Sequence, residues 1–286
     1  MRSSETNIRA QDGTSLFVRS LRCDEGCERT LVILHGTSEH GGRYDHVARV
    51  AVRQSWDVLM VDVRGHGQSG GIPVHATRFE NYLTDLDAVW QQFSLSPQQT
   101  VLLGHSFGGL VSIRFAETRP QQLSGLVLSS PLLAVRVKID AFTLALGKLM
   151  SILRPTTRFT SKVPPESTCR DPEVLKRREA DPLIHRSVTA AWFFQMKRAL
   201  SEAWRDTQKL TVPTLALQAE VDLIVDPSVV EPWLHTTASR RPEFRLIPDA
   251  YHEIFNEPEW SDTLDGALTW MNDQVPRVSV GQSLRD

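Results

Sequence analysis

Short apolar runs recur along the chain, and their spacing restricts the fold more than any other feature of the sequence. Each run is three or four residues long, and the stretch between two runs leaves room for a helix. Strands that are apolar on both faces and alternate with helices are typical of a parallel α/β sheet. We expect strands at 31–34, 58–61, 101–103, 126–128, 214–217 and 244–247.

Two local patterns predict elements that lie against this sheet. Asp12-Gly13 stands between two short alternating segments within 8–22, which predicts a β-hairpin at the sheet edge. Within 79–93, apolar residues recur every three or four positions, which predicts an amphipathic helix packed on the sheet.

One interval is too long for a simple connection between parallel strands. About eighty residues separate the strand that ends near Ser129 from the one that begins near Val212, whereas a crossover needs roughly a dozen or more. Prolines divide this interval, and helical patterns occupy 139–153 and 187–205. We therefore expect an α/β core with a mostly parallel central sheet, helices on both of its faces and an inserted helical cap. The predicted division is a first part of the core at 1–131, the cap at 132–206 and a second part of the core at 207–286.

The charge balance excludes one large class of function. Lys and Arg number 32 against 34 Asp and Glu, so the formal net charge is -2, without the basic surface that a nucleic-acid binder needs. Hydrophobic residues make up 41% of the chain and charged residues 23%, which is ordinary for a globular protein and unlike a disordered one. We expect a folded protein that does not bind nucleic acid.

The number of cysteines and the first residues of the chain indicate the cellular compartment that we expect. Three cysteines give no disulfide framework, so we interpret Cys23, Cys27 and Cys169 as free thiols in a reducing compartment. The first residues lack the apolar core of a signal peptide, and no apolar run reaches the roughly 18 residues of a membrane span. These features favour a cytoplasmic protein.

The segment Gly104-His105-Ser106-Phe107-Gly108 carries the clearest chemical signal. It follows an apolar strand and precedes a helical pattern, the context in which Gly-x-Ser-x-Gly forms a nucleophile elbow. The strained turn lifts the serine hydroxyl above the carboxyl ends of the strands, and small residues two positions away on each side leave room for it. The alternative is a glycine-rich turn with a buried serine. We interpret Ser106 as the nucleophile.

A serine nucleophile needs a base and an acid that orients the base, and in α/β enzymes of this kind the chain order is Ser, Asp or Glu, then His. The strand at 214–218 is followed by Glu220, Asp222 and Asp226. We favour Asp222, because it lies a few residues past the strand end, where a turn can direct a short carboxylate inward; Glu220 is the nearest alternative.

The base is expected to follow the last strand of the sheet. His252 lies in that loop, above the carboxyl ends of the strands, and we interpret it as the base. Other histidines fall in early connections, in the insertion or in a helical run, where a structural role is expected: His46, His75, His185 and His235.

Acyl transfer also requires two backbone N–H donors for the oxyanion. The residue after the nucleophile, Phe107, supplies one donor at the positive end of its helix. The loop at 35–42 supplies the other, and we expect it from Thr37. We interpret His35 as a residue that holds this loop and does not transfer protons.

Together these motifs resemble the monoacylglycerol lipases of the α/β-hydrolase superfamily, a group that overlaps the bacterial lysophospholipases. The resemblance spans about 8–272 and implies a triad of Ser106, Asp222 and His252, with Thr37 and Phe107 as oxyanion donors and no metal or organic cofactor. Many relatives carry Met where this chain has Phe107, a change that leaves the backbone donor intact. The residues that carry the resemblance are His35-Gly36, Ser38-Glu39-His40, Arg43-Tyr44, Asp62-Val63-Arg64-Gly65-His66-Gly67-Gln68-Ser69, the elbow with Gly109, Ala180-Asp181-Pro182-Leu183-Ile184, Leu210-Thr211-Val212-Pro213, Val221-Asp222 and Tyr251-His252-Glu253.

The cap carries two apolar clusters that bear on the substrate. One helical face within 139–153 is apolar, and a second cluster surrounds Trp192-Phe193-Phe194. Either cluster can pack inside the cap or form a rim that meets lipid. The family resemblance favours a rim that lines an acyl tunnel. The residues we expect to bind the acyl chain are Ile139, Phe142, Leu146, Leu149, Trp192 and Phe193.

The expected function is hydrolysis of monoacylglycerols to fatty acid and glycerol through an acyl-enzyme on Ser106, with transient membrane-surface contact through the cap. Within the same class, a lysophospholipase or a broad carboxylesterase is the alternative. A dehalogenase of this fold would need a carboxylate at position 106. Outside the class, a catalytically silent lipid-binding module is the alternative, although all three triad candidates are present.

Overall fold

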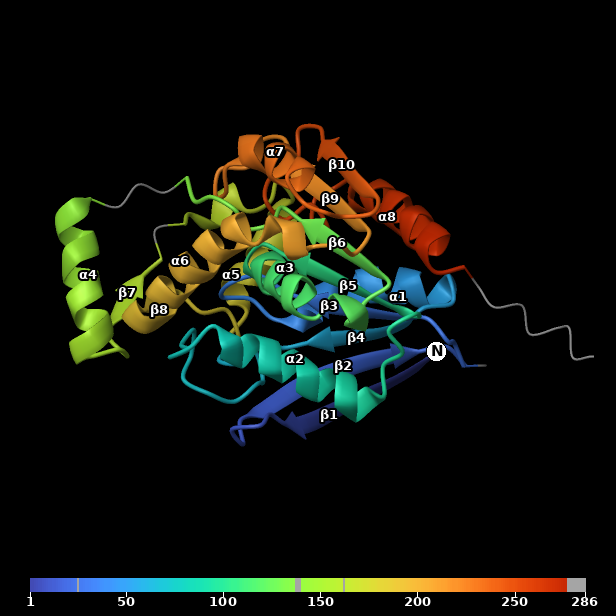
Figure 1. Cartoon of the computed structure of the whole chain (residues 1–286), viewed down its shortest axis with the longest axis horizontal. Coiled ribbons are helices and arrows are strands. Elements are labelled where there is room, and N and C mark those ends of the chain that lie inside the picture. The colour runs from blue at the N-terminus through green and yellow to red at the C-terminus, as the bar shows by residue number, and fades with distance from the viewer. Residues whose placement is uncertain (25, 137–139, 162, 277–286) are drawn as a thin grey trace, which may run out of the picture.

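A mostly parallel sheet of eight strands forms the centre of the protein (Figure 1). The computed structural model describes residues 1–24, 26–136, 140–161 and 163–276. The strand order is β1-β2-β4-β3-β5-β6-β9-β10, and the strands from β4 to β10 all pair in parallel. Their bounds are β1 Arg2–Arg9, β2 Ser15–Arg22, β3 Thr30–Leu34, β4 Asp57–Val61, β5 Thr100–His105, β6 Gly125–Ser129, β9 Thr214–Ala219 and β10 Pro242–Ile247. The predicted α/β fold class is confirmed.

The hairpin of β1 and β2 forms one edge of the sheet, as its turn sequence predicts. The two strands pair antiparallel from Arg2 opposite Arg22 to Arg9 opposite Ser15. Gly13 adopts φ 84°, a left-handed conformation that costs glycine little. Strand β2 also pairs antiparallel with β4, which joins the hairpin to the parallel part of the sheet.

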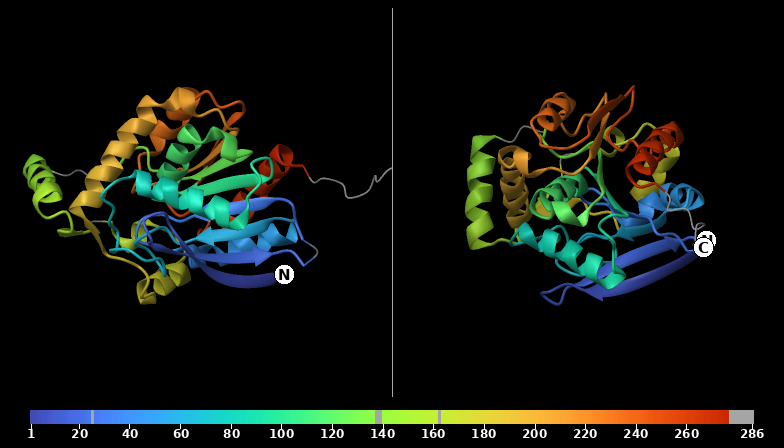
Figure 2. Two further views of the ribbon diagram at one scale, coloured as in Figure 1. Left: turned by 60° about the horizontal axis from the view of Figure 1, so that its bottom comes forward. Right: turned by 45° about the vertical axis from the view of Figure 1, so that its right-hand side comes forward.

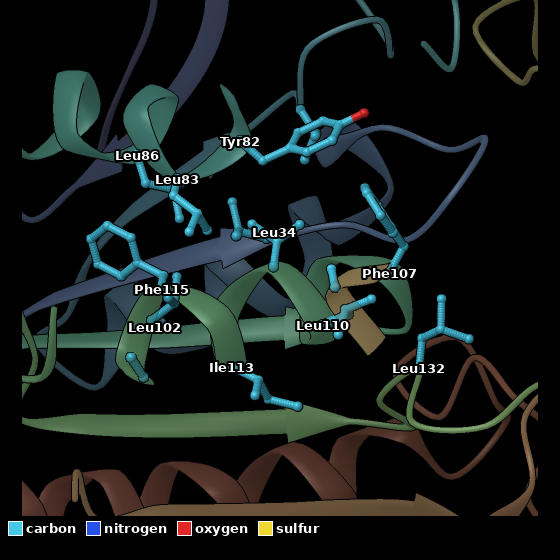
Figure 3. Close-up of a cluster of buried hydrophobic side chains, with 14 of the residues drawn as sticks. Leu34, Tyr82, Leu83, Leu86, Leu102, Phe107, Leu110, Ile113, Phe115 and Leu132 are labelled. Carbon is cyan, nitrogen blue, oxygen red and sulfur yellow. The ribbon is translucent and has the colours of Figure 1, made fainter. Parts of the chain in front are cut away.

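Helices cover both faces of the sheet (Figures 1 and 2). On β3, Leu31 and Ile33 belong to one apolar cluster and Val32 and Leu34 to the other, because successive side chains point to opposite faces. The first cluster includes residues of α1 and α8, and the second includes residues of α2, α3 and α7 (the second in Figure 3). The helix bounds are α1 Asp45–Arg53, α2 Glu80–Phe93, α3 Phe107–Thr118, α7 Val230–His235 and α8 Trp260–Gln274.

Between β6 and β9 the chain forms a separate set of elements. Helix α6 lies against the α3 side of the core, and α4 lies outside α6 (Figures 1 and 2). The elements are α4 Ala141–Leu153, β7 Arg158–Thr160, α5 Pro172–Ala180, β8 Ser187–Thr189 and α6 Ala190–Arg205. Short 3-10 turns complete the chain at η1 Gly41–Tyr44, η2 Pro120–Gln122, η3 Pro165–Ser167, η4 Thr207–Lys209 and η5 Pro227–Val229.

The predicted helix at 187–205 begins three residues too early. Ser187–Thr189 is extended and pairs antiparallel with β7, and the helix starts at Ala190. The Thr189 hydroxyl accepts a hydrogen bond from the backbone N–H of Trp192 at 3.3 Å. Threonine in this position satisfies an N–H that has no partner within the helix, so the helix begins after it.

The prediction that all three cysteines are free thiols is wrong. Cys23 and Cys27 form a disulfide in the connection between β2 and β3, and Cys169 is free and buried. The connection turns back on itself and brings the two Cα atoms to 5.9 Å, within the range of a disulfide. That turn is not apparent from a count of cysteines.

Candidate active site

Ser106 lies at the carboxyl end of β5, immediately before α3, in a strained backbone conformation. Its φ is 51° and its ψ is -116°, a combination that non-glycine residues rarely adopt. The conformation is held on both sides: the Ser106 N–H donates to the Ser129 carbonyl at 3.0 Å, and the Ser106 carbonyl accepts from the N–H of Leu132 at 3.0 Å. Two neighbouring segments of the chain therefore hold the strained conformation in place.

The glycines around Ser106 are required by close backbone approach. A Cβ on Gly104 would lie 2.5 Å from the Gly108 carbonyl oxygen, and a Cβ on Gly108 would lie 2.4 Å from the His35 carbonyl oxygen. Real Cβ contacts are not this short, so only glycine fits at either position. Gly108 therefore lets α3 approach the loop that follows β3.

The loop after β3 and the start of α3, which carry the two expected oxyanion donors, both adjoin Ser106. Phe107 is the first residue of α3, where backbone N–H groups have no partner within the helix. A Cβ on Gly36 would lie 3.2 Å from the Cβ of Ser106, so the backbone preceding Thr37 passes beside the serine. Thr37 itself is half-buried.

His35 holds this loop through both ring nitrogens. Its Nε2 accepts from the backbone N–H of Val63 at 3.0 Å, which leaves Nδ1 protonated and donating to the Gly36 carbonyl at 2.7 Å. Full burial lowers the pKa of His35, so the ring is neutral. Both nitrogens are engaged, which agrees with the interpretation of His35 as a structural residue.

Asp222 and His252 form a buried hydrogen-bonded pair. His252 Nδ1 lies 2.7 Å from Asp222 Oδ2, and since a carboxylate accepts, Nδ1 carries the proton and Nε2 is left as the basic nitrogen. The other carboxylate oxygen, Oδ1, accepts from the backbone N–H groups of Ile224 and Val225, both at 2.9 Å. Asp222 is fully buried and His252 is 4% exposed, so little water reaches the pair.

The two alternative acids have other partners. Glu220 is exposed, and its carboxylate accepts from the N–H of Asp249 at 3.0 Å. Asp226 accepts from the N–H of Ser228 at 3.1 Å at the start of a 3-10 turn. Of the three acids considered, Asp222 is the one that contacts His252 in the structure.

The charges and burial around the pair favour an ionised Asp222 and a neutral His105. Burial raises the pKa of Asp222, but the His252 charge and the hydrogen bonds from His252, Val225 and Ile224 outweigh it, so the pKa lies below its ordinary value. The His105 ring centroid lies 4.8 Å from that of His252, so the residue before Ser106 packs against the pair. Burial and the neighbouring His252 lower the pKa of His105 to about 4, so this ring is neutral at pH 7.

A buried ion network connects the loop at 35–42 to the loop that carries His252. The Arg43 guanidinium contacts Glu39 at 2.6 Å and binds Glu253, the residue after His252, through two hydrogen bonds of 2.9 and 2.6 Å. Glu39 in turn accepts from the N–H of Gly36 and from the Tyr44 hydroxyl. Burial raises the pKa of both carboxyls, but the Arg43 charge outweighs it, and both pKa values lie below their ordinary range.

Sequence reasoning did not find this network. Its residues do occur in the motifs that resemble the lipase family, but Arg43 and Glu253 are 210 positions apart, and nothing in the sequence pairs them.

The residues expected to bind the acyl chain are not in one place. Trp192 is 5% exposed and its ring centroid lies 5.1 Å from that of Phe107, and Phe193 packs against the same core. In contrast, three α4 side chains are exposed, with fractions of 78% for Phe142, 43% for Leu146 and 49% for Leu149. Ile139 lies outside the described residues. The acyl-binding role of these side chains remains a prediction.

With this geometry in place, the comparisons with known proteins decide the family. A family model described as Serine aminopeptidase, S33 (Hydrolase_4) matches residues 27–259. The chain belongs to this family. Phospholipase YtpA of Bacillus subtilis strain 168 is 30% identical over 247 residues, which cover 86% of this chain and 95% of the relative. Monoglyceride lipase of Rattus norvegicus is 30% identical over 273 residues, with 92% and 89% covered.

Solved structures agree with this family. The crystal structure of Paleococcus ferrophilus monoacylglycerol lipase superposes with a TM-score of 0.81 at 26% identity, covering 96% of this chain and 100% of that one. The protein is therefore a serine ester hydrolase of the α/β-hydrolase fold, similar to monoacylglycerol lipases and to a lysophospholipase of Escherichia coli. None of its described helices combines the length and the apolar character needed to cross a membrane.

Proposed function

We propose that the protein hydrolyses monoacylglycerols to fatty acid and glycerol through an acyl-enzyme on Ser106. The observation that carries the proposal is the buried pair of Asp222 and His252, with Nδ1 protonated, which packs against His105, the residue before the strained Ser106. The lipid part of the proposal is supported by relatives named as monoglyceride lipases and by the apolar surface of α4.

The reaction has two steps. In the first, His252 Nε2 takes the Ser106 proton, the serine oxygen attacks the ester carbonyl, and the backbone N–H groups of Thr37 and Phe107 stabilise the oxyanion. His252 then returns the proton to the leaving glycerol oxygen. In the second step water attacks the acyl-enzyme by the same route and releases the fatty acid. Asp222 keeps the imidazole oriented and stabilises its protonated form.

The nucleophile is tested by Ser106→Ala, with Ser201→Ala, an exposed serine on α6, as the matched control. We expect hydrolysis of a monoacylglycerol to fall by a factor of at least about 10³ in the first variant, because the covalent route is lost, and to be unchanged in the second. Labelling by a fluorophosphonate should likewise disappear only with Ser106→Ala. Retention of substantial hydrolysis by Ser106→Ala would refute the assignment.

A lysophospholipase or broad carboxylesterase is the second candidate, because one of the most similar relatives is named a phospholipase. A competition among glycerol monoesters, lysophospholipids and short p-nitrophenyl esters distinguishes the candidates by kcat/KM. We expect the glycerol monoesters to be preferred. A higher kcat/KM for lysophospholipids would replace the first candidate with the second.

We also propose that 132–206 acts as a cap and that α4 contacts a lipid surface transiently. Helix α4 contains Lys148 and no acidic residue; Arg154 follows its last turn, and Asp140 caps its first. Its exposed large apolar side chains are Phe142, Leu146, Leu149, Ile152 and Leu153, with exposed fractions between 43% and 78%. Such a patch favours insertion at a lipid interface.

The contact is tested by sedimentation with anionic phospholipid vesicles. We expect Phe142→Ser combined with Leu149→Ser to weaken vesicle binding by about tenfold or more, because each substitution removes a large apolar side chain from the interface. Leu246→Ser, at a comparably exposed leucine on β10, is the matched control and should bind like the wild type. Equal sedimentation of all three proteins would contradict a role for α4.

A further inference from the structure

Gln218 is a buried amide on β9 that faces the acid of the candidate active site. The side chain is fully buried, and the other residues of the strand are apolar apart from Thr214. Its Nε2 donates to Asp222 Oδ2 at 3.2 Å and to the carbonyl of Ala219 at 3.0 Å. Since a carboxylate and a carbonyl only accept, the orientation of the amide follows from its partners.

Stability does not account for this residue. The Gln218 side-chain oxygen, Oε1, is buried and has no hydrogen-bond partner among the described residues. A buried polar atom without a partner is unfavourable, and an apolar side chain of similar shape would avoid that cost on an otherwise apolar strand. The amide lies where its Nε2 donates to a carboxylate, which points to a role at that carboxylate.

The hydrogen bonds of Asp222 show what the amide adds. Oδ1 accepts from two backbone N–H groups, which fix one oxygen, while Oδ2 accepts from His252 and from Gln218. If Gln218 is removed, His252 is the one donor to Oδ2 that remains among the described residues. The carboxylate plane can then tilt together with the imidazole.

We propose that Gln218 is a positioning residue for ester hydrolysis, because its amide fixes Oδ2 of Asp222 in the direction of His252 Nδ1. The inference rests on the proposed roles of Asp222 and His252. It adds a fourth side chain, one that touches neither substrate nor oxyanion and acts through the acid alone.

Loss of the amide has two consequences. A neutral donor withdraws charge from the carboxylate, so removing it leaves more charge on Oδ2 and stabilises the imidazolium; the acidic limb of the kcat/KM profile then moves to higher pH. The carboxylate also becomes less well oriented, which lowers kcat. The other groups that face the pair are unchanged by the substitution: the neutral His105 ring, Glu253 with its Arg43 partner, and Arg136, which donates to the backbone carbonyl of Asp222.

The test compares Gln218→Met, which keeps the side-chain length without the donor, with Thr214→Val. Thr214 lies on the same face of β9, is fully buried and donates to the Val212 carbonyl, so its loss is a matched structural control. We expect Gln218→Met to lower kcat about 2- to 10-fold, because the lost hydrogen bond changes the orientation of the acid and does not involve the reacting atoms, with KM within twofold. The midpoint of the acidic limb should rise by several tenths of a pH unit, measured with a short soluble ester from about pH 5 to pH 9. Thr214→Val should leave the midpoint in place.

Failure of this inference can be separated from failure of the proposed function. A wild-type protein that hydrolyses no ester and takes no fluorophosphonate label overturns the proposed function. An active wild type whose pH profile superimposes on that of Gln218→Met overturns the role of Gln218. If the methionine variant does not fold, Gln218→Asn, which withdraws the amide by one methylene, is expected to shift the limb in the same direction, and an unchanged limb contradicts the proposal.

Discussion

At the scale of single residues, the site depends on glycines, whose lack of a side chain lets backbone segments approach each other closely. Gly104, Gly108 and Gly36 allow three backbone segments to meet around Ser106, and none of these positions has space for a Cβ without displacement. The strained serine is thus held by packing and backbone hydrogen bonds from outside its own turn.

Gly108→Ala tests this close packing. The added Cβ would lie 2.4–2.5 Å from the carbonyl oxygens of His35 and Leu34, which are backbone atoms at the end of β3 and the start of the next loop and cannot rotate away. We expect a loss of more than about 2 kcal/mol in the free energy of unfolding and at least a tenfold loss of ester turnover. Urea unfolding and initial rates measure the two effects.

Gly147→Ala is the control for that substitution. Gly147 lies within α4, where an added Cβ would be 3.5 Å from Phe194, an ordinary contact. Alanine is the better helix former by about 1 kcal/mol, so stability should rise or stay the same with activity unchanged. A Gly108→Ala protein as stable and active as this control would contradict the packing argument.

At the scale of elements, a second buried ion cluster joins α3 to the end of α6. Arg114 contacts Glu117 on its own helix, Asp206 at 3.1 Å and Glu202 at 3.5 Å. Burial raises the pKa of Glu117 to about 8, in spite of the opposing Arg114 charge. One oxygen of this carboxyl is buried without a hydrogen-bond partner among the described residues.

This cluster makes stability depend on pH. The pKa of Glu117 is about 8 in the folded protein and lies near its ordinary value of 4.5 after unfolding, so the folded state binds the extra proton between these values. Stability therefore falls as pH rises from about 4.5 to 8. We expect Glu117→Gln to remove this dependence and to raise Tm relative to the wild type by roughly 4 °C more at pH 8 than at pH 6, about 2 kcal/mol, because each pH unit below the folded pKa is worth about 1.4 kcal/mol.

Calorimetry at the two pH values measures this difference. Glu202→Gln, on the more exposed partner of the same arginine, is the control and should show no such change between the two pH values. A Glu117→Gln protein whose Tm difference from the wild type is the same at pH 6 and pH 8 would show that Glu117 does not titrate in this range.

At the scale of the whole molecule, the inserted elements are attached to the core at the site itself. The His185 N–H donates to the Ser38 carbonyl at 3.0 Å, and His40 lies 2.8 Å from Asp181, so two contacts join the insertion to the loop at 35–42. Trp192 of α6 adds an apolar contact with Phe107. The same insertion presents α4 outward, beyond α6 (Figure 2).

Substitutions on these two helices should therefore differ in their effect. Trp192→Ala removes a buried ring from the junction with the core, and we expect it to cost about 3–5 kcal/mol of unfolding free energy. Phe142→Ala, at a side chain that is 78% exposed, should cost less than about 0.5 kcal/mol. Guanidinium unfolding of both variants measures the difference; equal costs would mean that α4 packs as tightly as α6.

Local patterns in the sequence were sufficient for much of the fold. Apolar runs, a turn dipeptide and helical periodicity depend on neighbouring residues alone, and they predicted the sheet, the edge hairpin and α2. The elbow motif likewise placed Ser106 before α3, because its glycines and its position after a strand are local features. The start of α6 was missed by three residues, since a short strand there forms only through pairing with β7.

What the tertiary structure decided was the pairing of residues that are distant in the chain. Arg43 with Glu253, Gln218 with Asp222, and the choice of Asp222 over Glu220 as the partner of His252 all depend on where loops turn after their strands. The Cys23–Cys27 bond depends on a turn in the same way. Residue types and periodicity determine which elements form, because those forces act over a few residues; distances between side chains on separate elements are set only when the whole chain packs.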